Sequence, residues 1–180
     1  FPKGPNSLTA DAGSTIASLD DDSVISIDAV GSLRIATLLQ AHGKGSAINI
    51  NTDTEDQIAA AGGFTLLEGG KVIVQEDDAS ITIHSGDYMH IDSGSSVTAG
   101  VEFVDQDGNG SVEPRQTGEH TSLTLNAQGE LWLAGAVTSA GELDMDYTRA
   151  QFEHAEYFDT ILDKNLAAIE ATPELIQALQ

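Results

Sequence analysis

Cysteine is absent from the chain, so neither a disulfide framework nor a thiolate metal site is available to stabilise it. There is also no run of about 18 apolar residues that could cross a lipid bilayer as a helix, so we expect a soluble protein. Hydrophobic residues nevertheless make up 40% of the 180 residues, which is enough for a substantial core. We therefore expect one domain that rests on apolar packing and backbone pairing.

Basic residues are scarce, because 7 Lys and Arg stand against 29 Asp and Glu, for a net charge of −22. They are scattered singly, as Lys3, Arg34, Lys44, Lys71, Arg115, Arg149 and Lys164. Nucleic acids and anionic lipid surfaces both need basic patches, so we exclude both as partners. Two interpretations of the acidity stay open: it keeps the protein soluble in a salty environment, or divalent cations bind and screen it.

The sequence does contain a regular alternation of apolar and polar residues between residues 63 and 103. Short runs begin at residues 64, 72, 81, 89 and 97, with the period of two that is typical of a half-buried β-strand. Turn-forming residues such as Gly69-Gly70 and Asp77-Asp78 separate these runs. Similar runs recur on both sides of this stretch. The pattern predicts a mainly β domain of short strands.

Short strands between regular turns favour a parallel β-helix, a solenoid in which strands stack coil upon coil. A β-sandwich is the alternative, although its strands are usually longer, at about 5 to 6 residues. The residues expected to point inward are Ile25, Ile27, Leu33, Ile35, Ile48, Ile50, Val72, Val74, Ile81, Ile83, Met89, Ile91, Leu123, Leu125, Leu131, Leu133, Leu143 and Met145.

The chain divides into three parts on this interpretation. Residues 1–6 are rich in Pro and Gly and predict a linker stub, and residues 7–146 form the repetitive β domain with a loop insertion at 104–121. From Tyr147 the pattern changes, and 147–180 are predicted to be helical. The apolar stripe of this segment consists of Phe158, Ile161, Leu162, Leu166 and Ile169. We expect it to cap the open end of the β-helix.

Two stretches near the end of the β domain are similar to each other. Leu-Thr-Leu-Asn-Ala-Gln-Gly-Glu-Leu-Trp-Leu-Ala-Gly spans residues 123–135, and Ser-Ala-Gly-Glu-Leu-Asp-Met-Asp spans residues 139–146. Both resemble the repeats of filamentous-haemagglutinin-type exoproteins, which are bacterial β-helical adhesins. The resemblance implies a non-catalytic structural or adhesive segment of a large bacterial protein that is secreted or lies on the cell surface. We expect a cell-surface glycan or protein as its partner, with self-association as a further option.

The motif with the clearest chemistry is Asp105-Gln106-Asp107-Gly108-Asn109-Gly110-Ser111-Val112-Glu113. It resembles the first nine positions of an EF-hand or dockerin-like calcium loop, in which oxygens at alternate positions converge on the ion and a Gly permits the sharp turn. The sequence therefore predicts one Ca²⁺ ion, with Asp105, Asp107, Asn109, Ser111 and Glu113 as its ligands.

The motif departs from a complete EF-hand at its end. Gln116 stands where a bidentate carboxylate is expected, so Glu102 or Glu119 would have to complete the coordination. The alternative is an ordinary Asp-Gly-Asn-Gly turn that binds no metal.

A second group of residues has metal-binding side chains without the spacing that selects a metal. It comprises His84, Asp87, His90 and Asp92, which we interpret as exposed residues on adjacent strands. His154 lies between Glu153 and Glu156 on the predicted helix, and we interpret these residues as a solvated face.

No catalytic residue is predicted, because the sequence has no Gly-x-Ser-x-Gly elbow, phosphate-binding loop or Cys nucleophile. The enzyme alternative is a β-helical polysaccharide lyase or glycoside hydrolase. Carboxylates are plentiful, but an acidic sugar would also require Arg34, Arg115 and Arg149 to converge. A further alternative is a phage tail-spike module, which would form a trimer.

Calcium binding can be tested by calorimetric titration of the wild-type protein and Asp107→Ala. We expect heat of binding for the wild type alone, because the variant loses the carboxylate ligand of Asp107. Binding to the folded state stabilises it by mass action, by about 2.7 kcal/mol at 100 times the dissociation constant, so chelation should lower the melting temperature. Equal heats for both proteins, or no shift on chelation, would reduce the motif to an ordinary turn.

Overall fold

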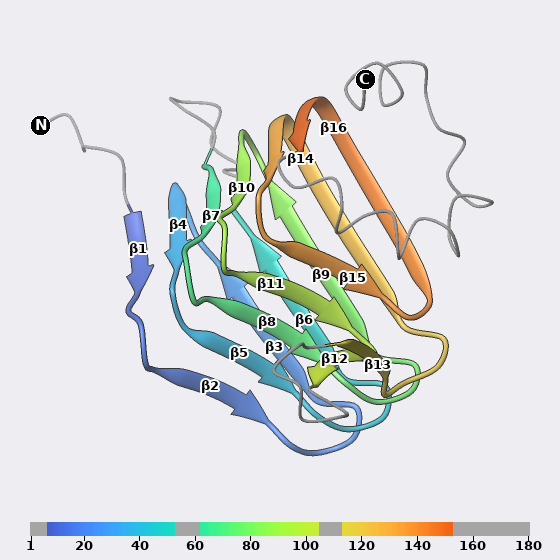
Figure 1. Cartoon of the computed structure of the whole chain (residues 1–180). Helices are drawn as coiled ribbons and strands as arrows, with labels where there is room; N and C mark the ends of the chain where they lie inside the picture. The colour runs from blue at the N-terminus through green and yellow to red at the C-terminus, as the bar shows by residue number, and fades with distance from the viewer. Residues whose placement is uncertain (1–6, 53–61, 105–112, 153–180) are drawn as a thin grey trace, which may run out of the picture.

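The computed structural model describes residues 7–52, 62–104 and 113–152 (Figure 1). This part of the chain is mainly β and contains no helix. Its strands are β1 (Ser7–Ala10), β2 (Thr15–Ser18), β3 (Val24–Asp28), β4 (Ser32–Ile35), β5 (Leu38–Ala41), β6 (Ala47–Asn51), β7 (Phe64–Leu66), β8 (Lys71–Val74), β9 (Ser80–Ser85), β10 (Met89–Ile91), β11 (Ser96–Ala99), β12 (Val101–Val104), β13 (Glu113–Gln116), β14 (Ser122–Leu133), β15 (Ala136–Ser139) and β16 (Glu142–Phe152).

The strands form two large parallel sheets and one small antiparallel pair. The first sheet has the order β1-β4-β7-β10-β14-β9-β6-β3, with β16 added beside β14, and the second has the order β15-β11-β8-β5-β2. A strand early in the chain therefore pairs with the strand three places later. We call each set of three consecutive strands a pass, the first being β1, β2 and β3.

The larger sheet curls into a half-barrel, because β14 belongs to two rows of strands. Its first half, Ser122 to Ala127, pairs with β9, whereas Leu131 to Leu133 pair with β10. The five-stranded sheet faces this curled sheet across one shared apolar core (Figure 1).

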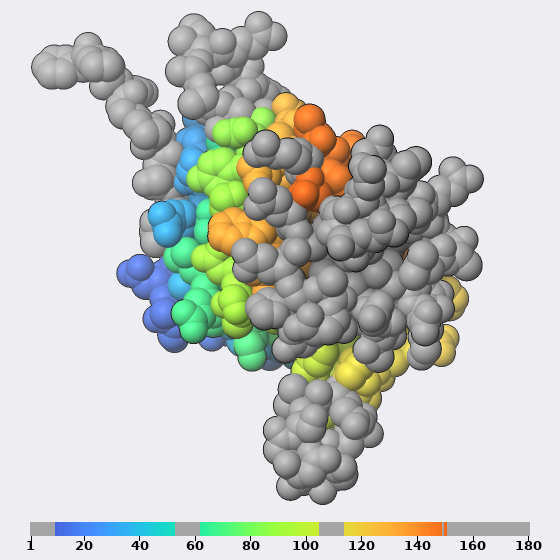
Figure 2. Space-filling model, turned by 45° about the horizontal axis from the view of Figure 1, so that its top comes forward, coloured from blue at the N-terminus to red at the C-terminus, as the bar shows by residue number. Residues whose placement is uncertain are grey.

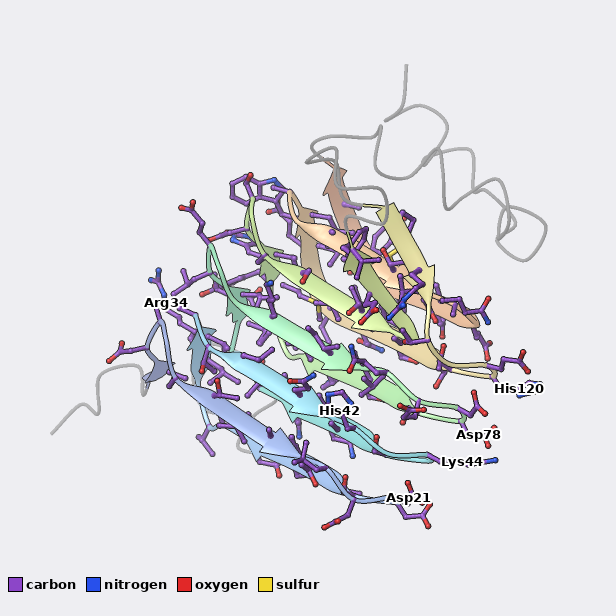
Figure 3. The ribbon with its side chains drawn as sticks, turned by 60° about the horizontal axis from the view of Figure 1, so that its bottom comes forward. Asp21, Arg34, His42, Lys44, Asp78 and His120 are labelled. Carbon is purple, nitrogen blue, oxygen red and sulfur yellow. The ribbon has the colours of Figure 1, made fainter. Side chains whose placement is uncertain are left out.

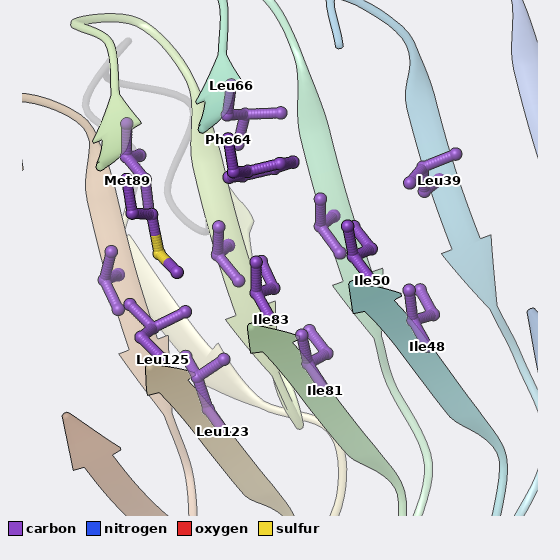
Figure 4. Packing of buried hydrophobic residues seen from close by; sticks show 14 of the residues in the cluster. Leu39, Ile48, Ile50, Phe64, Leu66, Ile81, Ile83, Met89, Leu123 and Leu125 are labelled. Atoms are coloured by element: carbon purple, nitrogen blue, oxygen red, sulfur yellow. The ribbon is translucent and has the colours of Figure 1, made fainter. Parts of the chain in front are cut away.

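Aliphatic side chains in register build the core. Ile48, Ile81 and Leu123 are register neighbours on β6, β9 and β14, and all three are fully buried (Figure 4). Each added strand extends such a column, and burial of apolar area at roughly 25 cal/mol per Å² stabilises the pairing. The inward positions predicted from the sequence are confirmed, since all are buried except Ile27, Leu143 and Met145, which are partly buried against the core.

The predicted fold, a parallel β-helix with a C-terminal helical cap, is wrong. The solenoid was expected to have short strands with a turn at every corner, but the 12-residue strand β14 continues through Ala127-Gln128-Gly129, although Gln and Gly there have turn composition. Ala127 is buried and the Gly129 N–H donates to the Asp87 carbonyl (2.7 Å), so the chain bends here without leaving the sheet. The result is a curled sheet. The β-sandwich alternative is wrong as well, because both large sheets are parallel.

The predicted start of the helical cap is also a strand. Residues 147–152 continue β16, and residues 149–152 pair with the second half of β14, from Glu130↔Arg149 to Leu133↔Phe152. Tyr147 and Ala150 pack against the core, so strand pairing with burial outweighs the local helical pattern. The stripe from Phe158 to Ile169 lies outside the described residues, as do residues 1–6.

The insertion predicted at 104–121 includes a strand, β13, so it is not a loop throughout. β12 and β13 pair antiparallel, with Val104 opposite Glu113 and Val101 opposite Gln116. Within the described residues there is no helix with the length and apolar character needed to span a membrane.

Substitution at a central core position should be far more harmful than at the end of the sheets. Ile81→Ala should lower the free energy of unfolding by about 2–5 kcal/mol, because Ile81 is fully buried and its removal leaves a cavity. Ile16→Ala is the matched control, since Ile16 is 45% exposed on β2, and its cost should stay under about 1 kcal/mol. Urea unfolding measures both, and equal losses would contradict this description of the core.

Candidate functional site

The predicted calcium motif is described only at its end. Asp105, Asp107, Asn109 and Ser111 lie outside the described residues. Glu113 is the first residue of β13 and pairs with Val104, so the residues that flank the motif lie on adjacent antiparallel strands. The calcium site stays a prediction from the sequence.

The histidines of the second metal pattern lie on different rows. His84 on β9 stands between Asn51 and Asn126, whereas His90 on β10 stands between Thr65 and Trp132. The residues that the structure describes contain no group of three His, Asp or Glu side chains placed to hold a metal ion. His154 lies beyond them.

The three arginines of the enzyme alternative belong to different strands. Arg34 is exposed on β4, and Arg149 belongs to β16, at the position opposite Glu130. Arg115 on β13 forms an ion pair with Glu102 on the neighbouring β12. Register therefore places these residues on three separate strands.

The most distinctive outer surface is a group of three aromatic rings, Tyr88, His90 and Trp132, which we call the aromatic patch. His90 and Trp132 are register neighbours on β10 and β14, with ring centroids 5.0 Å apart in an edge-to-face arrangement. The Tyr88 ring lies 4.8 Å from His90 on its other side. All three side chains are half-buried. The three rings thus form a partly exposed cluster in which His90 lies against both Tyr88 and Trp132.

The strand register places an exposed arginine, Arg34, in the same cross-strand row as the patch, beyond the buried Thr65. The cross-strand row that contains Trp132 and His90 continues through Thr65 on β7 to Arg34 on β4. Figure 2 shows a face of the molecule on which atoms of the blue, green and orange parts of the chain lie one after another. The Nε1–H of Trp132 is buried and has no hydrogen-bond partner among the described residues, so only part of the indole ring faces outward.

Local sequence fixes the place of the Tyr88 ring. A Cβ atom at Gly63 would lie 2.2 Å from the Tyr88 Cζ atom, so only glycine leaves room for the ring. The Tyr88 carbonyl accepts hydrogen bonds from the Phe64 N–H (2.9 Å) and from the buried Ser85 hydroxyl (2.6 Å). The backbone and the ring of Tyr88 are therefore both held in place.

A second surface, which we call the acidic corner, consists of stacked turns at residues 20–22, 43–45, 77–78 and 118–120. Figure 3 shows Asp21, Lys44, Asp78 and His120 at the tips of successive turns. The backbones are linked from turn to turn, because the Gly45 N–H donates to the Asp77 carbonyl (2.9 Å) and the Asp78 N–H to the Glu119 carbonyl (2.9 Å).

Carboxylates of the acidic corner strengthen this stacking. The Asp21 carboxylate accepts from the Lys44 N–H (2.9 Å), and the Asp77 carboxylate accepts from the Glu119 N–H (2.8 Å). The exposed Lys44 ammonium lies 3.2 Å from the Asp78 carboxylate, which raises the pKa of Lys44 through its hydrogen bond and its charge. These carboxylates hold turns together, so we assign the corner a structural role.

The sequence predicted no functional role for Tyr88 and Trp132, and His90 was interpreted as an exposed residue. Trp132 meets His90 only because β10 and β14 are paired, and nothing in the local sequence of either strand reveals that pairing. The signals of the patch in the sequence are the short strand pattern of Met89–Ile91 and Gly63, which leaves room for the Tyr88 ring. Comparison of the chain with protein-family models, with curated proteins and with solved structures found no match.

Proposed function

We propose that this chain is a non-catalytic adhesive module of a bacterial secreted or cell-surface protein, and that its aromatic patch binds a glycan. The observation that carries the proposal is the placement of Tyr88, His90 and Trp132 side by side on an outer sheet face. Aromatic rings bury the apolar C–H faces of sugars, and neighbouring polar side chains bind the sugar hydroxyl groups.

The form of the surface favours an extended polymer. Adjacent strands lie about 4.8 Å apart, so the row from Trp132 to Arg34 spans about 14 Å, enough for several successive sugar rings. Arg34, which is exposed, supplies a polar group at the end of the row. The net charge of −22 disfavours acidic polysaccharides, so the ligand is a neutral glycan.

The placement of charged groups supports binding over catalysis. Asp21 and Asp77 accept hydrogen bonds from the backbone of neighbouring turns, and Glu102 is paired with Arg115. A lyase or glycosidase would need carboxylates and a cation aimed at one sugar, and Arg34 and Arg149 belong to different strands. We therefore prefer the adhesive function to the enzyme alternative.

Glycan binding can be tested by affinity electrophoresis against neutral polysaccharides, with an acidic polysaccharide as a comparison. The wild type should be retarded by at least one neutral polymer, and Trp132→Ala should bind it about tenfold more weakly, because roughly 1.4 kcal/mol of ring contact is lost. Trp132→Phe should restore part of the affinity.

Thr124→Ala is the matched control, because Thr124 lies on the same strand in a different outer row, and it should bind as the wild type does. Equal binding by Trp132→Ala, or no retardation of the wild type by any neutral polymer, would contradict the proposal. Release of shorter sugars that stops when one Asp is replaced would establish the enzyme alternative.

A further inference from the structure

The strands of the first pass, β1, β2 and β3, lie at the ends of the two large sheets. Each pairs with one strand only among the described residues. The N–H of Ala29, the residue after β3, points toward β6 and donates to the Asn51 carbonyl (2.9 Å). Alternate residues of a strand direct their backbone groups to opposite sides. The groups that point to the open edge are therefore those of Val24, Ser26 and Asp28.

The same pass exposes apolar side chains that are buried elsewhere. The exposed large hydrophobic residues among those described are Ile16 (45%), Leu19 (73%), Val24 (60%) and Val30 (68%), and all belong to β2, β3 or the turns that follow them. Ile16 stands in register with Leu39, which is fully buried. The core column that contains Leu39 therefore ends at Ile16, with no further strand over it among the described residues. The terminal units of stacked folds need a cover at this position.

The charge of the first pass is of one sign. Residues 7–31 contain Asp11, Asp20, Asp21, Asp22 and Asp28 and no Lys, Arg or His. Carboxylates stand close to both ends of β3, with Asp22 before the strand and Asp28 as its last residue. A partner strand that lies along β3 would meet acidic groups at each end and apolar groups between them.

We propose that the open edge of β3 is a docking site for a basic, extended segment of another polypeptide, which pairs with it as an additional strand. Backbone hydrogen bonds to Ser26 and its neighbours supply the affinity, as in other cases of strand addition. Alternate apolar residues of the partner extend the columns that begin with Ile25 and Ile27, and Lys or Arg residues at its ends meet Asp22 and Asp28.

A second copy of this chain is a poorer occupant of the edge. Two first passes placed edge to edge would bring Asp residues against Asp residues, and like charges that face each other across strands are destabilising. A basic segment turns the same carboxylates into attractive contacts. The proposal is independent of glycan binding, because the aromatic patch lies on β10 and β14.

The test uses a fluorescent peptide, Lys-Val-Thr-Val-Thr-Val-Lys with blocked ends, titrated with the full chain and followed by anisotropy. We expect saturable binding that weakens as salt is added, and no binding of the matched peptide with Glu in place of Lys. Ser26→Pro should weaken binding at least tenfold, because it removes an outward N–H that β6 does not use. Ser26→Ala should bind as the wild type does.

A second pair of measurements keeps the test valid if Ser26→Pro fails to fold. The double variant Asp22→Asn, Asp28→Asn should bind more weakly and with less dependence on salt, and the Ser26 amide should become protected from hydrogen exchange when the peptide binds. Equal binding of the Glu peptide, or unchanged affinity in both variants, would overturn the proposal. Protection of the Ser26 amide without peptide would also overturn it, because the edge would already be occupied by the chain itself or by a second copy.

Discussion

Parallel backbone pairing between strands of successive passes is the constraint on which the rest of this structure depends. Because Ile48 pairs with Ile81 and Ile81 with Leu123, every pass must present its apolar residues at the same positions. A shift by one residue would turn each column outward, so the apolar core fixes the register as strongly as the hydrogen bonds do. The acidic corner follows the same rule, since Asp22, Gly45, Asp78 and His120 all adopt positive φ at equivalent places in stacked turns.

The same register produces the surfaces that can recognise other molecules. Outward residues fall into rows across the sheet, so His90 and Trp132 become neighbours although they are far apart in the chain. At the other extreme, Ile16 occupies a core position with no further strand beyond it among the described residues. The glycan site and the edge site that we propose are therefore both consequences of the strand register. The first uses a row of outward residues across paired strands, and the second uses the core column that ends at Ile16.

The sequence allowed the strand pattern and the inward residues to be predicted, because period-two alternation depends on neighbours in the chain. It did not reveal the continuity of β14, because Ala127-Gln128-Gly129 has turn composition and only its position beside Asp87 makes it a bend within a strand. The second half of β16, from Tyr147, was mistaken for the start of a helix, since its pairing with β14 cannot be seen in the local sequence. The aromatic patch was missed for the same reason, as its rings belong to strands that meet only in the folded sheet.

Register between β9 and β14 is the most direct test of this account, and the absence of cysteine makes engineered disulfides easy to interpret. Thr82 and Thr124 are register partners, about 4.8 Å apart across parallel strands, which is within the range of about 4.4–6.8 Å for disulfide-bonded Cα atoms. Thr82 and Asn126 are diagonal neighbours at about 7–8 Å. The account predicts that Thr82→Cys with Thr124→Cys forms an intramolecular disulfide on mild oxidation, whereas Thr82→Cys with Asn126→Cys does not. Cross-linking of the second pair in preference to the first would contradict it.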